Sequence, residues 1–156
     1  MSLLNTFHWF EATGIGAYGR RSTYFFPAAE VVHLLGLTLL LGTALVLNLR
    51  LLGAIMRRQS IPEIADATTP LLWTGVGLAM GSGLLLFLAE AVKCYYNVAF
   101  WYKMGLLMSA IVFQIVVHRR LSAVASTATA VVKGTAALSL LLWFGVAVAG
   151  RAIAFV

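Results

Sequence analysis

Four long apolar stretches limit this chain to one class of fold. They cover residues 26–49, 69–92, 97–118 and 134–156, and each has the roughly 20 residues that a helix needs to cross the apolar core of a bilayer. Hydrophobic residues make up 62% of the 156 residues and charged residues 10%, which would leave a soluble domain with an apolar surface that it could not bury. The sequence therefore predicts an integral membrane protein.

The segments between the four stretches are short, so consecutive spans are expected to run antiparallel. The predicted fold is all-α, a single polytopic domain over residues 1–156 that forms a four-transmembrane-helix bundle. The second span is predicted to begin at Thr69, as the N-cap, with Pro70 in the first turn.

The residues before the first span predict a short helix in the membrane interface. Residues 3–12 place Leu4, Phe7, His8 and Glu11 at helical spacing, with His8 expected to face the bundle. The glycine-rich run GIGAYGRRS that follows is interpreted as a flexible turn.

Positively charged residues outside the spans predict the orientation of the bundle. Because loops rich in Lys and Arg remain in the cytoplasm, the side with more of these residues is expected to be cytoplasmic and both termini outside. The predicted location is the inner (cytoplasmic) membrane of a bacterium, where the outside of a Gram-negative cell is the periplasm. The predicted cytoplasmic set is Arg50, Arg57, Arg58, Arg119, Arg120 and Lys133, and the outer set is Arg20, Arg21 and Lys93.

Charge and motifs exclude several classes of function. The formal net charge of +6 follows largely from this topology, so it indicates no nucleic-acid partner. A single cysteine, Cys94, excludes an internal disulfide and a cysteine-based metal cluster. The chain has no GxSxG, HExxH or phosphate-binding glycine loop, so hydrolytic chemistry is not expected.

Three ionisable residues, His33, Lys103 and Arg151, lie inside the spans at a similar depth in the predicted outer half. A charged group at the bilayer centre costs roughly 2.5–3.5 kcal/mol on insertion scales, so such residues commonly mark a ligand site. Neutral imidazole is a common axial ligand of haem iron, which makes His33 the expected ligand. Lys103 is expected to be a second ligand or, like Arg151, to pair with a carboxylate such as a haem propionate.

Other residues are expected to complete this cofactor site. Glu30 and Leu37 share a helical face with His33, and Gly36 is expected to clear space there for a planar ligand. His8 is included in the candidate site because its helix lies at the same side of the membrane.

A simpler interpretation needs no ligand. Lys103 and Arg151 would then extend toward the headgroups, and His33 would donate a hydrogen bond to a backbone carbonyl in a packed core. Glu90 would pair with Lys93 at i+3 or with Lys103 across the bundle.

The second span contains four glycines, which have no side chain and so permit the close approach of a neighbouring helix or of a flat cofactor. Helix packing is the simpler of the two explanations. Gly77 and Gly81 form a GxxxG pair, and Gly75 and Gly83 lie beside it.

Two further patterns in the third span are given the simpler interpretation. Met104 and Met108, at i and i+4, are read as core residues rather than copper ligands. His118, followed by two arginines, is read as an interfacial helix end, with a second haem there as the alternative. A rise of about 25 Å separates His118 from His33 on spans that run the same way, so the two cannot share one metal.

The chain resembles a known group of proteins in three segments: FFPAAEVVHLLGLTLLLGTALVLNLRLLG, NVAFWYKMGLLMSAIVFQIVVHRR and LWFGVAVAGRAIAF. They resemble small four-helix bacterial membrane proteins labelled only as a domain of unknown function. The histidine of the first span and the early lysine of the third are also similar to CopD-like copper-resistance proteins and HemJ-type protoporphyrinogen oxidases. In the HemJ type these two positions belong to a haem b site, and the resemblance places them at His33 and Lys103.

The predicted function is electron transfer by a membrane protein that binds haem b, with iron bound by His33 and Lys103 and copper as the alternative metal. One alternative is a haem-dependent oxidoreductase that acts on a porphyrin or a quinol. The other is a non-redox membrane subunit or copper-handling protein. The expected partners are the lipid bilayer and a quinone or a periplasmic redox protein, and the glycine-rich faces permit a homo-oligomer or a place in a membrane complex.

Overall fold

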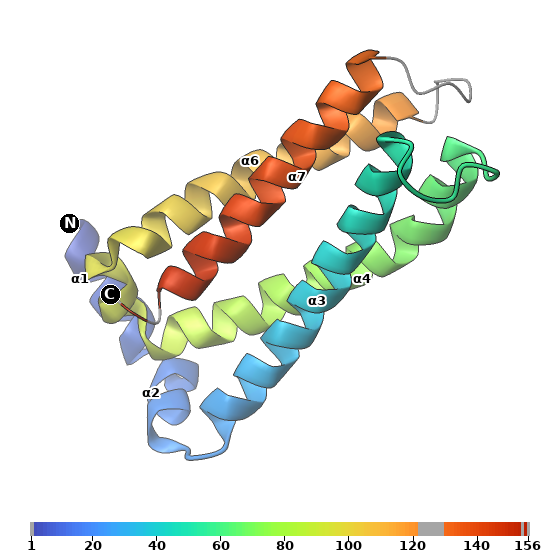
Figure 1. Cartoon of the computed structure of the whole chain (residues 1–156). Helices are drawn as coiled ribbons and strands as arrows, with labels where there is room; N and C mark the ends of the chain where they lie inside the picture. The colour runs from blue at the N-terminus through green and yellow to red at the C-terminus, as the bar shows by residue number, and fades with distance from the viewer. Residues whose placement is uncertain (1, 122–129, 154, 156) are drawn as a thin grey trace.

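The computed structural model describes residues 2–121, 130–153 and 155, and this part of the chain contains helices and no strands (Figure 1). Within it, four helices are long and apolar enough to cross a membrane, and consecutive ones run in opposite directions. The predicted antiparallel four-helix membrane bundle is confirmed. The four helices are α3 (Phe25–Leu51), α4 (Ile61–Ala89), α6 (Val98–Leu121) and α7 (Ala130–Ala152).

Three short helices gather at one end of the bundle, where α3 begins and α4 ends, and we call this the α1 end (Figure 1). They are α1 (Leu3–Ala12), α2 (Gly14–Arg21) and α5 (Ala91–Tyr96). The predicted helix over residues 3–12 is therefore confirmed, with Ser2 as its N-cap.

The predicted flexible turn after α1 is wrong, because most of GIGAYGRRS forms α2. Glycine permits a close approach here: a Cβ at Gly16 would lie 2.5 Å from the carbonyl oxygen of Leu88 in α4. The Arg20 guanidinium lies 3.3 Å from the Glu11 carboxylate and also donates a hydrogen bond to the carbonyl of Ala89. Tertiary contacts with the end of α4 thus hold a segment whose composition alone favours a turn.

The predicted start of the second span at Thr69 is also wrong. Helix α4 begins at Ile61, where the Ser60 hydroxyl accepts a hydrogen bond from the backbone N–H of Glu63. Ser60 and Glu63 have the spacing of a capping box, S-x-x-E, which marks a helix start in polar sequence. Thr69 lies inside the helix and donates a hydrogen bond to the carbonyl of Ala65, and Pro70 is an internal residue of α4.

The fourth span also begins earlier than predicted, at Ala130, and its helix ends at Ala152. Lys133 is thus in α7 rather than in a loop, because a hydropathy pattern excludes polar residues that a helix accepts near its end. Residues 122–129 of the predicted linker, and the side chain of His118, lie outside the described part of the structure.

The long helices pack as two close pairs, α3 with α4 and α6 with α7 (Figure 1). Gly36 and Gly75 lie where α3 and α4 come closest. A Cβ on Gly36 would lie 2.6 Å from the backbone nitrogen of Ala79, and one on Gly75 would lie 2.6 Å from that of Leu40. Small residues at these two positions let the helix backbones come into contact.

Buried apolar side chains fill the bundle from its middle to the end opposite α1. Polar contacts are satisfied within this core, as where the Asn48 amide donates a 3.0 Å hydrogen bond to the Ser139 hydroxyl. Toward the α1 end the packed core stops and a cavity begins. The middle of the core contains Leu40, Ala44, Leu72, Ala110, Trp143 and Val146.

Candidate functional site

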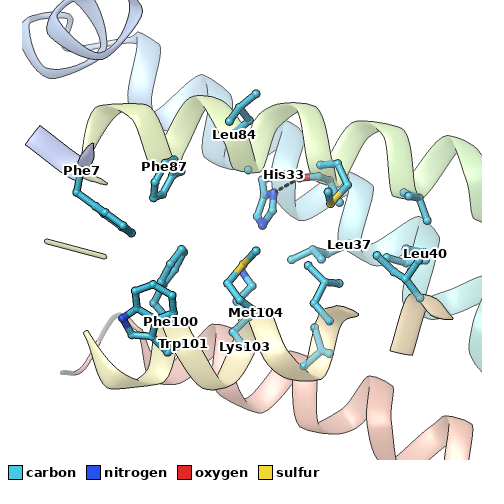
Figure 2. A pocket seen from close by; sticks show the side chains of 17 residues that line it. Phe7, His33, Leu37, Leu40, Leu84, Phe87, Phe100, Trp101, Lys103 and Met104 are labelled. Carbon is cyan, nitrogen blue, oxygen red and sulfur yellow. Dashed lines mark hydrogen bonds between the residues drawn. The ribbon is translucent and has the colours of Figure 1, made fainter. Parts of the chain in front are cut away.

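The cavity lies between α4 and α6, with α3 forming part of its wall (Figure 2). Its volume is about 420 Å³, within the 300–1,000 Å³ that is usual for small-molecule sites. Among the described residues that line it, His33 and Lys103 are the ones with a titratable side chain, and most of the others are apolar. The structure thus brings two of the predicted site residues to the wall of one cavity.

The imidazole of His33 is held by α4 and directed into the cavity (Figure 2). Its Nδ1 lies 2.9 Å from the carbonyl oxygen of Ala79 and 3.2 Å from the hydroxyl oxygen of Ser82. The Ser82 hydroxyl donates to the carbonyl of Leu78, and a carbonyl oxygen can only accept, so Nδ1 carries the hydrogen. In the neutral ring, Nε2 then keeps its lone pair as a free donor for a metal ion.

Gly83 makes room for this ring. A Cβ at position 83 would lie 3.0 Å from Cε1 and 3.3 Å from Nδ1 of His33, closer than side chains normally pack. The sequence predicts this role for Gly36, but Gly36 is buried against the backbone of Ala79 and does not line the cavity. Gly36 brings α3 close to α4, and Gly83 accommodates the imidazole.

Lys103 reaches the cavity from α6 and leans toward α7. Its Cε, Cδ and Nζ atoms lie 3.5–3.7 Å from the position of a Cβ on Gly150. The side chain is half-buried, and none of the ion pairs in the described residues involves it. Its amine is therefore available to a ligand that carries a negative charge.

Met104, the residue after Lys103, faces His33 across the cavity (Figure 2). Met80, on α4, also lines the wall. The sequence predicts that Met104 and Met108 are both core residues, but in the structure Met104 lines the cavity and Met108 is 55% exposed on the outer surface of α6.

An aromatic cluster closes the cavity at the α1 end (Figure 2). Phe7 of α1 is buried, and its ring centroid lies 5.5 Å from that of Phe87, 5.2 Å from that of Tyr95 and 5.9 Å from that of Trp101. Phe87 stacks on Phe100 at 5.8 Å. The short N-terminal helix thus contributes an apolar side chain to the cavity rather than a ligand.

Comparison with known proteins assigns the chain to a family but to no activity. The model described as "Family of unknown function (DUF6644)" matches residues 6–156. The chain belongs to this family. No curated protein and no solved structure matches it, so the similarity to CopD-like and HemJ-type proteins stays a prediction from the sequence. The match begins within α1 and takes in every described residue that lines the cavity of the DUF6644 bundle.

Besides Gly36, three predicted site residues of this DUF6644 chain lie away from the cavity. Glu30 and His8 are exposed, and neither lines the cavity. Arg151 is exposed near the end of α7, with its guanidinium carbon 4.5 Å from the centroid of the Phe155 ring. Similar depth in the membrane did not place these residues on the inner face of the bundle.

The remaining charged candidate, Glu90, has a local partner. Its carboxylate lies 3.2 Å from the Lys93 amine, which is the i+3 pair and one of the two partners that the sequence predicts. The described residues contain no group of three or more His, Cys, Asp or Glu side chains placed to hold a metal ion. A metal at the cavity therefore needs a macrocycle or sulfur ligands in addition to His33.

Proposed function

We propose that this protein holds a b-type haem in the cavity, with His33 Nε2 bound to the iron, and passes electrons at the membrane. The observation that carries the proposal is that the His33 ring points into a cavity of about 420 Å³ instead of a packed core, while its Nδ1 donates a hydrogen bond to the carbonyl of Ala79 and leaves Nε2 free (Figure 2). Histidines that bind metals commonly donate their other ring N–H to a backbone carbonyl or a carboxylate, which fixes the tautomer and the ring orientation.

The wall of the cavity suits a large, mostly apolar cofactor with an acidic edge. Most of the side chains that line the cavity around His33 are apolar, and Gly83 leaves space beside the ring. The Lys103 amine is the group that would pair with a carboxylate of such a cofactor. When bound, haem supplies one-electron chemistry at its iron, and the residues of the chain hold and orient it.

The cavity wall reaches the surface of the bundle, which suits electron exchange with a partner. Leu84 and Trp101 line the cavity and are 57% and 46% exposed. A quinone in the bilayer or a redox protein at the α1 end can thus come close to the cofactor. We place the α1 end on the periplasmic side of a bacterial inner membrane because fewer cations lie there.

A copper(I) site is the second candidate function. His33, Met80 and Met104 line the same cavity, and thioether sulfur is a soft ligand that selects Cu(I). The copper-handling alternative therefore rests on two methionines that the sequence alone did not place near His33.

The test is the cofactor content of the purified protein in detergent. We expect a reduced-minus-oxidised absorption spectrum typical of a b-type haem, and we expect His33→Ala to lose most of the haem while it still inserts into the membrane. The matched control is His8→Ala, because His8 is exposed and outside the cavity.

Two results would contradict the haem proposal. Equal haem content in His33→Ala and the parent would place the cofactor elsewhere in the chain. A parent protein without haem that retains copper, and that loses it in Met80→Leu, would favour the copper site.

A further inference from the structure

We infer that Met104 is the second axial ligand of the cofactor, on the face opposite His33. The inference rests on the proposed haem site and names the residue that sets its redox potential. The side chains of Met104 and His33 point toward one another from opposite walls of the cavity (Figure 2).

The two ligands come from different helix pairs. His33 belongs to α3 and is held by the Ala79 carbonyl of α4, so one wall of the cavity fixes the imidazole. Met104 belongs to α6, on the other side of the cavity. Axial ligands of a planar macrocycle lie on its two opposite faces. His33 and Met104 likewise lie on opposite walls of the cavity, so a macrocycle would fit between them (Figure 2).

The helical period explains why Met104 rather than its neighbours faces His33. The residues of α6 that line the cavity at i, i+4, i+7 and i+11 are Phe100, Met104, Leu107 and Ile111, which form one face of a helix. Lys103 is about 100° around the helix from Met104, and its chain packs beside Gly150 of α7. Lys103 therefore lies at the side of the cavity, where an amine suits a carboxylate better than the iron.

Chemistry favours the same assignment. A thioether is neutral and needs no proton removed before it binds iron, whereas a lysine ligand must first lose its charge. Paired with histidine, methionine raises the reduction potential of haem iron, as in cytochromes c. The remaining candidate, Met80, comes from α4, the helix that also holds His33, so it does not lie on the opposite wall.

The experiment compares Met104→Leu with Met108→Leu and Lys103→Leu in the full-length protein. Leucine keeps the apolar volume of methionine and removes the sulfur. We expect Met104→Leu to retain haem through His33 but to change from low to high spin in the ferric state, and to have a lower midpoint potential. Met108→Leu, one turn along the same helix at a surface position, should match the parent in both measurements.

The outcomes separate this inference from the haem proposal. A parent without haem contradicts the proposed function itself. A parent with haem whose spin state and potential are unchanged by Met104→Leu, or changed by Lys103→Leu instead, overturns the role of Met104. If Met104→Leu holds no haem, then Met104→His, which restores a neutral ligand at this position, must regain low-spin haem for the inference to stand.

Discussion

At the scale of single residues, Gly83 decides how the His33 imidazole can lie. The ring is held on one side by the carbonyl of Ala79, and Gly83 leaves it just enough space on the other. A hydrogen bond from Nδ1 and the missing side chain of Gly83 thus both fix the position of the ring, and a small change at either one should displace Nε2, the proposed ligand atom.

We therefore expect Gly83→Ala to weaken haem binding by about 10-fold, as is common when the groups that orient a metal ligand are altered. The new Cβ would lie 3.0 Å from His33 Cε1 and displace the ring by a few tenths of an ångström. Gly81→Ala is the matched control, because a Cβ there has nothing within 4 Å. Haem titration of the apoproteins measures the effect, and equal affinity in the two variants would show that the ring is not confined.

Part of the site could be predicted from single residues and part could not. His33 and Lys103 are conspicuous as ionisable groups in apolar spans, and the structure places both at the cavity. The role of Gly83 depends on the register of α4 against α3, which no pattern within one helix contains. Arg151 is at a similar depth but is exposed. Its exposure could not be predicted, because the depth of a residue in the membrane does not determine which face of the helix it occupies.

At the scale of the helices, the contact between α3 and α4 sets that register. The backbones of α3 and α4 come into contact at Gly36 and Gly75, where no side chain keeps the helices apart. This contact aligns His33 with Ala79 and Gly83. The GxxxG pair in the sequence is not the contact surface, because a Cβ on Gly77 or Gly81 would have nothing within 4 Å. The glycines that pack are the ones beside the motif.

We expect Gly75→Ala to destabilise the bundle by about 1–3 kcal/mol, the usual cost of an overpacked contact. Its Cβ would lie 2.6 Å from the backbone nitrogen of Leu40, which cannot move without shifting α3. Gly77→Ala is the control and should be neutral or stabilising, since alanine is favoured over glycine inside a helix by roughly 0.5–1 kcal/mol. Unfolding in mixed micelles with increasing SDS gives both values, and a loss of stability in Gly77→Ala alone would reverse the assignment of the packed face.

The helix ends show why hydropathy alone predicted that four spans exist but not where each helix begins. An apolar window finds the segment inside the bilayer, but α4 extends through polar sequence back to its cap at Ser60. The spacing of Ser60 and Glu63 was a usable signal for this start. Thr13 caps α2 in the same way, because its hydroxyl accepts a hydrogen bond from the backbone N–H of Gly16. The glycine-rich sequence that follows favours a turn, and α2 depends on contacts with Leu88 and Ala89 of α4.

At the scale of the whole molecule, the orientation in the membrane decides in which half of the bilayer the cavity lies. The α1 end carries the cavity, and Arg57 and Arg58 lie at the opposite end, after α3. Arg50 lies there too, buried, with its guanidinium donating to the carbonyl of Gln59. The excess of cations at that end predicts that it stays in the cytoplasm.

The native cysteine is a poor reporter of this orientation. Burial, with a smaller contribution from Glu90, raises the pKa of the Cys94 thiol to about 11. Because the thiolate is the reactive form, Cys94 should react slowly with maleimides at neutral pH on either side of the membrane. A topology assay therefore needs new cysteines at exposed positions in a Cys94→Ser background.

Tyr96 and Gln59 are suitable positions, since both are exposed and lie at opposite ends of the bundle. In intact spheroplasts we expect an impermeant maleimide to label Tyr96→Cys and to leave Gln59→Cys unlabelled until the cells are lysed. Labelling of both variants after lysis confirms that each thiol is accessible. The opposite pattern in intact cells would put the α1 end in the cytoplasm. The proposed haem at His33 would then exchange electrons with partners on the inner side, and a periplasmic redox protein would be excluded as the partner.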